Sequence, residues 1–287
     1  MNMAVPALNI GDPADIVHSS IACQLRLGMP ELCRTGLSET WLVRMCGHLH
    51  WQALAQAHGI DQPVFRNSEG ARLYPAFRVV RVLDGRLEEA GENDLLDMVL
   101  TLRRTSRAGF DSEVALTVAG RHIATVTIES AFILRAVEGV NLSARRGTVA
   151  QPCLLSPTTT DRPSRPDMVW PEGPILSETI IDPTPHEDFN GVGMLYCASF
   201  QAMLDRAEWQ WFRHSDPLTT TRSRMIQFLG NIELGDRVQA TLHQIERHGD
   251  RLTHHIMLRR VSDGTPIAKA VTERAMVPAT DLIRRIS

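Results

Sequence analysis

An internal repeat is the feature that most constrains the fold of this 287-residue chain. Residues 120–131 read GRHIATVTIESA and residues 264–275 read GTPIAKAVTERA, so five of twelve positions are identical at a constant offset of 144 residues. Each segment follows another strand-like run across a turn. Self-similarity at an offset close to half the chain predicts two copies of one structural unit.

Between the two copies lies a segment with the composition of a linker. Residues 143–174 contain six prolines and a cluster of Ser and Thr. Such a segment favours extended backbone and has little apolar surface to bury. We therefore expect an N-terminal unit at 1–145, a Pro-rich linker at 146–174 and a C-terminal unit at 175–287.

The first unit is predicted to open with a helix over residues 37–58. Ser38 is the N-cap candidate, because its side-chain oxygen can accept a hydrogen bond from the first turn, and the acidic Glu39 follows it. Apolar residues recur at helical spacing, at Trp41, Leu42, Met45 and Leu49. The strand candidates that follow span residues 73–83, 96–105, 112–119 and 122–134.

The second unit repeats this order. A short strand near 176–181 and a helix over 195–212 precede strand candidates at 219–229, 236–247, 251–262 and 266–277. One long helix followed by four antiparallel strands, twice, is an α+β pattern. It predicts a sheet wrapped around a central helix, which is the hot-dog fold, present in tandem as a double hot-dog.

Composition excludes several classes of protein. Charged residues make up 22% of the chain and the net charge is −3, without a basic stripe, so nucleic acid is not an expected partner. The N-terminus lacks the pattern of a signal peptide, and no apolar run is long enough to span a membrane. The five scattered cysteines lack zinc-site spacing and fit a reducing cytoplasm. We therefore expect a cytoplasmic protein without a metal site.

A Gly-rich turn precedes the second helix. Residues 188–207 read DFNGVGMLYCASFQAMLDRA. This stretch resembles the loop-and-helix signature of 4-hydroxybenzoyl-CoA-thioesterase-like hot-dog proteins, in which an Asp is followed three residues later by Gly, with an aromatic residue further along the helix. Asn190 stands at the Asp position, Gly193 at the Gly position and Phe200 at the aromatic position. The resemblance implies that N–H groups at the helix N-terminus polarise a thioester carbonyl.

Asn190 departs from that signature in a way that changes the expected chemistry. The Asp of the signature acts as nucleophile or general base, whereas an amide carries no charge and has negligible basicity. An amide can still hold a thioester or enolate oxygen. The alternative interpretation is that Asn190 and Gly191 only form the turn that leads into the helix.

A wider resemblance covers both units and the linker. Residues 28–54 read GMPELCRTGLSETWLVRMCGHLHWQAL, and together with LYPAFRVVRV and NGVGMLY they resemble a family of tandem hot-dog biosynthetic proteins. This family is typified by the bifunctional acyltransferase/decarboxylase of the leinamycin pathway. The resemblance implies a polyketide-type enzyme that takes methylmalonyl-CoA, decarboxylates the acyl group and transfers it to an acyl carrier protein. The coenzyme A thioester is then a substrate, and no other cofactor is expected.

The same resemblance implies catalytic residues. The family's acyl-accepting residue is a tyrosine of the N-terminal half, and the resemblance places this role on Tyr74, the only tyrosine of the first unit. A phenol needs a neighbouring base or cation to act as a nucleophile. His50 lies one helical turn from apolar residues, so we expect it to face inward as that base or as a hydrogen-bond donor. The alternatives are that Tyr74 packs within the sheet and His50 within the core.

The predicted substrate-binding set consists of Gly191 and Gly193 in the loop, Ser38 at the first helix and Trp51 within it. Ser38 is chiefly an N-cap candidate. Trp51 belongs to the tryptophans that would build a dry apolar pocket, in which loss of a charged carboxylate is favoured.

Other functions remain open. An acyl-ACP dehydratase or hydratase would use His50 with Asp188, although the motif HxxxGxxxxP is absent. A hot-dog thioesterase, or a catalytically inactive protein that binds acyl carrier protein, is also consistent with Asn190. For the leading hypothesis we expect Tyr74, His50 and Asn190 to approach one cavity between the halves, in a monomer or a homodimer.

Overall fold

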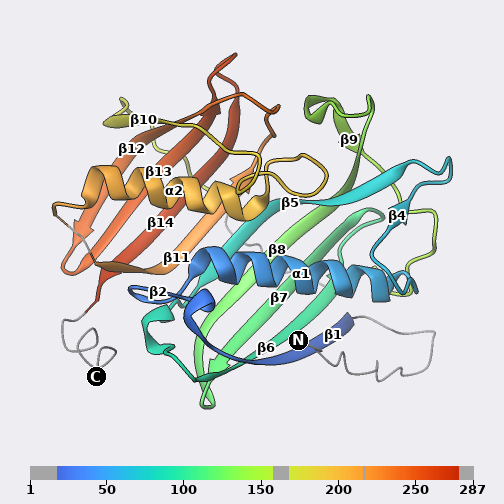
Figure 1. Ribbon diagram of the computed structural model, residues 1–287, viewed down its shortest axis with the longest axis horizontal. Helices are drawn as coiled ribbons and strands as arrows, with labels where there is room; N and C mark the ends of the chain where they lie inside the picture. Colours follow the sequence, from blue (N-terminus) through green and yellow to red (C-terminus); the bar gives the residue numbers. More distant parts are fainter. Residues whose placement is uncertain (1–17, 158–167, 216–217, 278–287) are drawn as a thin grey trace.

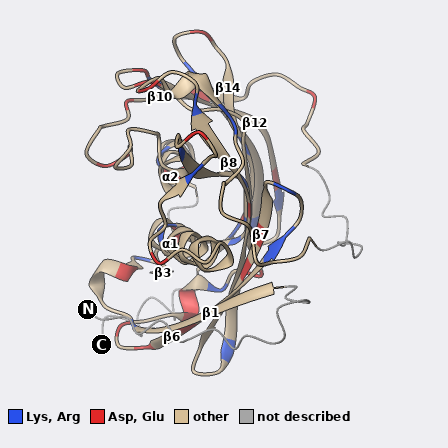
Figure 2. Ribbon diagram, turned by 90° about the vertical axis from the view of Figure 1, so that its right-hand side faces the viewer, with Lys and Arg blue, Asp and Glu red and all other residues tan. Residues whose placement is uncertain are grey.

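The computed structural model describes residues 18–157, 168–215 and 218–277. Two long helices, α1 (Glu39–Ala57) and α2 (Cys197–Phe212), pack against each other on one face of a 12-stranded sheet (Figure 1). Figure 2 shows both helices on the concave side of this curved sheet. No helix of the described part of the chain is long and apolar enough to cross a membrane.

Each half contributes one long helix and a set of antiparallel strands. The strands of the first half are β1 (His18–Arg26), β2 (Leu32–Cys33), β3 (Gly36–Leu37), β4 (Phe65–Arg66), β5 (Arg72–Leu83), β6 (Leu95–Arg104), β7 (Gly109–Val118), β8 (Arg121–Arg135) and β9 (Ala144–Arg146). Those of the second half are β10 (Ser177–Ile181), β11 (Thr219–Phe228), β12 (Val238–His248), β13 (Arg251–Arg260) and β14 (Pro266–Met276). Short 3-10 turns lie at Met29–Glu31, Leu87–Glu89 and Asn141–Ser143.

The strand order shows that the two halves share one topology. The strands of the main sheet are ordered β1-β6-β7-β8-β5-β11-β14-β13-β12-β10. From the outer edge to the centre, the order β1-β6-β7-β8-β5 of the first half corresponds to the order β10-β12-β13-β14-β11 of the second. The halves join where β5 and β11 pair antiparallel, from Arg224 opposite Val82 to Gln227 opposite Val79. The predicted double hot-dog is therefore confirmed.

The sequence repeat corresponds to equivalent places in the two halves. Gly120 and Gly264 lie just before β8 and β14, with φ of +76° and +71°, a region that a residue with a Cβ adopts only under strain. Ile123 and Ile267, three residues further on, are both fully buried. The repeated residues therefore mark the same two places in each half: the turn before the strand and the first core position that follows it.

The predicted helices agree with α1 and α2 to within two residues at either end, and the predicted long strands agree closely as well. Strand β1 is not predicted from the sequence. It forms an edge of the sheet, and only Ser19, Ile21 and Leu25 of its residues are buried. A short amphipathic edge strand rich in polar residues gives a weak periodic signal.

Two apolar cores lie beneath the helices, one in each half. Part of the predicted linker contributes to the first, because Val149 and Leu155 are buried and the N–H of Leu154 donates to the Ala57 carbonyl at 2.7 Å. The division at 145 and 174 remains a prediction.

Candidate functional site

A cavity of about 1480 Å³ lies where the two halves meet. Its walls come from one face of α1, from the start of β5 and from the loop that joins β10 to α2. Phe77, Ile133, Phe200 and Phe228 make much of its interior apolar. A half-open space of this size and character, bounded by residues of both halves, is the principal candidate for a ligand site.

One stripe of α1 faces the cavity. Gly47, His48, Trp51 and Ala55 all line it, at the spacing of three to four residues that keeps side chains on one helix face. Trp51 therefore lies where the sequence predicts it. The histidine on this wall is His48.

His50 points away from the cavity, so the expectation that it approaches Tyr74 and Asn190 is wrong. Two residues on from His48, a helical side chain lies on roughly the opposite face. The ring of His50 is fully buried, and its nitrogens bond to the hydroxyls of Ser112 at 2.9 Å and Ser130 at 2.8 Å. Burial lowers the pKa of His50 to about 3, so the ring is neutral.

Tyr74 and Asn190 both line the cavity, from β5 and from the loop before α2. The guanidinium carbon of Arg72 lies 5.5 Å from the centre of the Tyr74 ring. The sequence therefore places these two residues correctly at one cavity, while their chemical roles stay predictions.

The loop before α2 is shaped by Asn190 itself. Its Oδ1 accepts hydrogen bonds from the N–H of Val192 at 3.1 Å and of Met194 at 3.0 Å. Gly193 completes this tight turn with φ of +73°. Asn190 thus forms a turn, as one interpretation held, yet its Nδ2 group has no hydrogen-bond partner among the described residues.

Two glycines of the loop have different surroundings. Gly191 lines the cavity, and its role in substrate binding stays a prediction. Gly193 does not line it, and its carbonyl instead accepts from Nδ2 of Asn141 at 2.7 Å. Asn141 is buried in the turn between β8 and β9, and its Oδ1 accepts from Arg135 at 2.6 Å. Sequence analysis does not identify Asn141 and Arg135, because nothing in their local pattern indicates a contact with a loop fifty residues away.

The N-terminus of α2 opens toward the cavity. Tyr196 is the N-cap residue and Cys197 the first residue of the helix, and both line the cavity. Burial raises the pKa of the Tyr196 phenol, and it raises the pKa of the Cys197 thiol to about 12. Both groups are therefore protonated at neutral pH. Among the first N–H groups of the helix, that of Ser199 donates to the Tyr196 carbonyl at 2.9 Å. The N–H groups of Cys197 and Ala198 have no intrahelical acceptor and can donate to a ligand.

The remaining predicted residues lie outside the cavity. Ser38 is the N-cap of α1, as predicted, and its Oγ accepts from the N–H of Trp41 at 3.3 Å. Asp188 is buried, and its Oδ2 accepts from the N–H of Thr184 at 2.8 Å. The pair proposed for a dehydratase, His50 and Asp188, is therefore absent from the cavity wall.

Few charged side chains line the cavity. Among the described residues, Asp61 is its only carboxylate, and Arg72 and Arg260 are its only permanent cations. Arg260 is already bound to Asp263, with Nη2 to Oδ2 at 2.6 Å and Nε to Oδ1 at 2.9 Å. Arg72 is exposed and has no ion pair with any residue that the structure describes.

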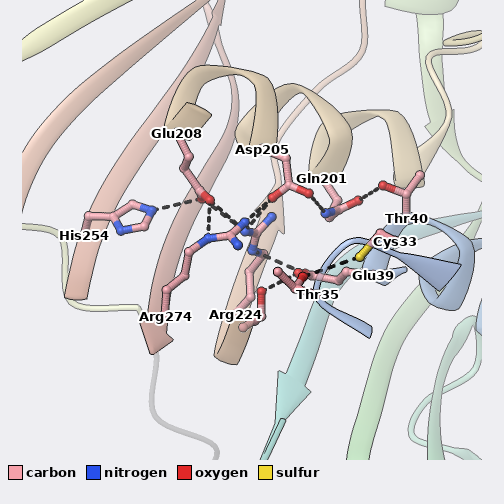
Figure 3. Close-up of polar contacts among 11 residues, drawn as sticks. Cys33, Thr35, Glu39, Thr40, Gln201, Asp205, Glu208, Arg224, His254 and Arg274 are labelled. Carbon is pink, nitrogen blue, oxygen red and sulfur yellow. Dashed lines mark hydrogen bonds and ion pairs between the residues drawn. The ribbon is translucent and has the colours of Figure 1, made fainter. Parts of the chain in front are cut away.

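A second polar assembly lies at the other end of the helix pair (Figure 3). We call it the Arg224 cluster, and its members are Glu39, Asp205, Glu208, Arg224, His254 and Arg274. The Nη2 group of Arg224 lies 2.9 Å from Asp205 and 3.1 Å from Glu208, and its Nε lies 3.3 Å from Glu39. Because Glu39 belongs to α1 and Arg224 to β11, the cluster joins the two halves.

Charges within the Arg224 cluster compensate one another. Nε2 of His254 lies 2.9 Å from Glu208, and Arg274 contacts both Glu208 and Asp205. Burial by itself would raise the pKa of Glu208, but Arg224 and Arg274 hold it well below its usual range. The sequence gives no signal for this cluster, because its members come from both helices and from β11, β13 and β14.

The sequence matches no family model and no curated protein. The fold, however, is similar to solved structures of acyl-ACP thioesterases. The 12:0-ACP thioesterase from Umbellularia californica aligns with a TM-score of 0.66 and 10% identity over 89% of this chain and 93% of that chain. An acyl-ACP thioesterase from Bacteroides thetaiotaomicron aligns with a TM-score of 0.61 and 11% identity over 89% of this chain and 97% of that chain. At such identities the likeness establishes a shared double-unit fold.

Proposed function

We propose that this chain binds acyl thioesters of coenzyme A or of an acyl carrier protein and hydrolyses them. The observation that carries the proposal is the apolar cavity between the halves, into which the N-terminus of α2 opens. An acyl chain can be buried against Phe77 and Phe200. The thioester carbonyl can then accept hydrogen bonds from the first N–H groups of α2.

Hydrolysis requires a base that activates water. His48 lies on the cavity wall, and imidazole is the side chain most often used as general base near neutral pH. Water attacks the carbonyl carbon as His48 accepts its proton, and the oxyanion is held by the helix amides and by Nδ2 of Asn190. Collapse expels the thiolate, which takes up the proton from His48. The structural neighbours named above are thioesterases, which supports this reaction class.

The test is release of free thiol from acyl-CoA and acyl-carrier-protein substrates of increasing chain length. His48→Gln is expected to lower kcat by about a hundredfold or more. His122→Gln is the matched control, since His122 is exposed near the turn between β7 and β8. Absence of turnover of every thioester by the unaltered protein would contradict the proposal.

A second candidate function is the decarboxylating acyl transfer implied by the leinamycin-type resemblance. Two observations favour it: Tyr74 and Asn190 line one cavity, and Asn190 leaves the signature position of the loop uncharged. In this reaction the Tyr74 hydroxyl attacks the thioester of methylmalonyl-CoA, its proton leaves on the CoA thiolate, and CO₂ departs from the bound acyl group to give an enolate. Protonation of the enolate and attack by the carrier-protein thiol then release Tyr74.

Mass spectrometry distinguishes the candidates. Incubation with methylmalonyl-CoA and a carrier protein should give CO₂ and acylated carrier if the second candidate is right, and Tyr74→Phe should abolish transfer. Release of the free acid without CO₂ supports hydrolysis. Binding without any turnover supports the carrier-binding alternative.

A further inference from the structure

Three arginines share one face of the sheet at the edge of the cavity. Arg66 on β4 is directly opposite Arg72 on β5, and Arg72 lines the cavity beside Tyr74. Arg146 on β9 is opposite Ile133, which is itself opposite Tyr74. Because directly paired residues point to the same face, Arg66, Arg72 and Arg146 lie on the same face of the sheet as Tyr74, with Arg72 two residues before it on β5 and Arg146 two strands away. We call these three residues the arginine rim.

The arginine rim is electrostatically unfavourable when nothing is bound. Like charges directly opposite one another on neighbouring strands destabilise a sheet. All three arginines are exposed, and none forms an ion pair with a carboxylate of the described residues. Arg66 donates only to the Gly70 carbonyl, at 2.7 Å. An anion bound between them would remove this repulsion.

Other charges near the cavity mouth do not supply that anion. Asp61 lines the cavity, and Glu69 and Glu138 are exposed on neighbouring turns, but none of them is within ion-pair distance of the rim. The remaining cation of the lining, Arg260, is neutralised by Asp263. Free positive charge is therefore concentrated on the side of the cavity formed by β4, β5 and β9.

We propose that the arginine rim binds the phosphate of the phosphopantetheine arm that carries the acyl group. This inference rests on the proposed function, since it assumes that a thioester enters the cavity. Guanidinium groups bind phosphate oxygens through paired hydrogen bonds, and planar forks such as Arg72 and Arg146 suit that geometry. The thioester lies at the N-terminus of α2, and the phosphate stays at the mouth. Coenzyme A and an acyl carrier protein both carry this phosphate.

Calorimetric binding of 4′-phosphopantetheine and of pantetheine tests the inference without any need for turnover. The unaltered protein should bind the phosphorylated arm at least tenfold more tightly, and Arg72→Gln and Arg146→Gln should each reduce this preference by about tenfold. Arg121→Gln, which removes an exposed arginine beyond β7, should preserve it. Equal affinity for the two arms in the unaltered protein, or a preference that survives in the double variant, would overturn the inference.

Two further measurements separate this inference from the proposed function and distinguish the carriers. Hydrolysis of an acyl N-acetylcysteamine thioester, which lacks phosphate, tests the proposed function alone. If the protein binds the phosphorylated arm more tightly but hydrolyses no thioester, the arginine rim is supported as a phosphate site and the proposed function is rejected. Affinity for acyl-CoA and for acyl-carrier protein should fall together in the variants. A loss confined to the carrier protein would show a protein contact instead of phosphate binding.

Discussion

The two halves place polar groups at the same points of their central helices but use them differently. His50 is the twelfth residue of α1, and Glu208 is the twelfth residue of α2. Each side chain is buried and reaches two strands of its own half, His50 through Ser112 and Ser130, Glu208 through His254 and Arg274. Ser130 and Arg274 are separated by 144 residues, the offset of the sequence repeat.

The ninth residue of each helix differs between α1 and α2, and this difference determines which half of the helix pair leaves room for a cavity. In α1 this residue is Gly47, and in α2 it is Asp205. Gly47 faces the cavity beside Tyr196 and Phe77. Asp205 instead joins Arg224 next to Glu39, the first residue of α1. The duplicated fold thus has two equivalent positions, one at the N-terminus of each helix. Charged side chains of the Arg224 cluster fill the position at the start of α1, and the position at the start of α2 is the cavity.

The strongest test of this contrast removes the centre of the Arg224 cluster. Arg224→Met should lower the free energy of unfolding by about 3 to 5 kcal/mol, because Glu39 would remain buried without a cation and Glu208 would keep only Arg274 of its two arginines. Arg237→Met is the control, since Arg237 and Asp182 form an exposed pair, and it should cost less than about 1 kcal/mol. Urea unfolding measures both. A loss below 1 kcal/mol for Arg224→Met would show that the cluster is not a stabilising centre.

A second test uses pH to separate the neutral His50 site from the charged cluster. The folded pKa of His50 lies below its ordinary value of 6.5, so the unfolded chain binds the proton first and stability falls as pH drops below 6.5. The expected loss at pH 5 is about 2 kcal/mol. Glu208, with a lowered pKa, loses its contribution only below the ordinary Glu range. The free energy of unfolding, measured at pH 7, 6 and 5, should depend less on pH in His50→Gln than in the unaltered protein. The same pH dependence in both proteins would contradict the lowered pKa of His50.

A third test introduces into the cavity a carboxylate, the type of negative charge that the Arg224 cluster contains. Asn190→Asp keeps the oxygen that accepts from Val192 and Met194, so the loop should remain folded. A carboxylate about 4 Å from a developing oxyanion or enolate opposes it by roughly 4 kcal/mol at an effective dielectric near 20. Even half of this lowers the rate more than tenfold. Single-turnover rates would refute the idea if Asn190→Asp reacted as fast as the unaltered protein.

The smallest expected effect is that of a substitution at Gly47, the helix residue that faces the cavity. In Gly47→Ala the new Cβ would lie 3.3 Å from Oη of Tyr196 and 3.4 Å from the Phe77 ring. The gain in helix propensity, about 1 kcal/mol, should offset this crowding, so stability should change by less than that amount. Affinity for acyl ligands should nevertheless fall severalfold, because the cavity narrows. Gln52→Ala, which removes atoms from the same wall, should not weaken binding, and a parallel loss there would argue against a steric cause.

Local signals account for the parts of the molecule that could be predicted. Apolar periodicity identifies both helices, and Ser38 marks the start of α1 because its oxygen caps a free N–H there. The repeat at Gly120 and Gly264 identifies the duplication, since a turn with positive φ requires glycine at one point in each copy. Tyr74 and Asn190 reach one cavity because the hot-dog order fixes where β5 and the loop before α2 must lie.

What the sequence determined by itself, then, is the order of elements, the duplication and the neutrality of Asn190. The tertiary structure alone decided which histidine faces the cavity, since His48 and His50 differ only by a rotation around α1 that depends on the partners packed against each face. It also decided that Arg224 meets three carboxylates from two helices and that three arginines share one face of the sheet with Tyr74. Contacts between distant segments arise from the sheet register and the helix packing, and the charges of single residues carry no information about either.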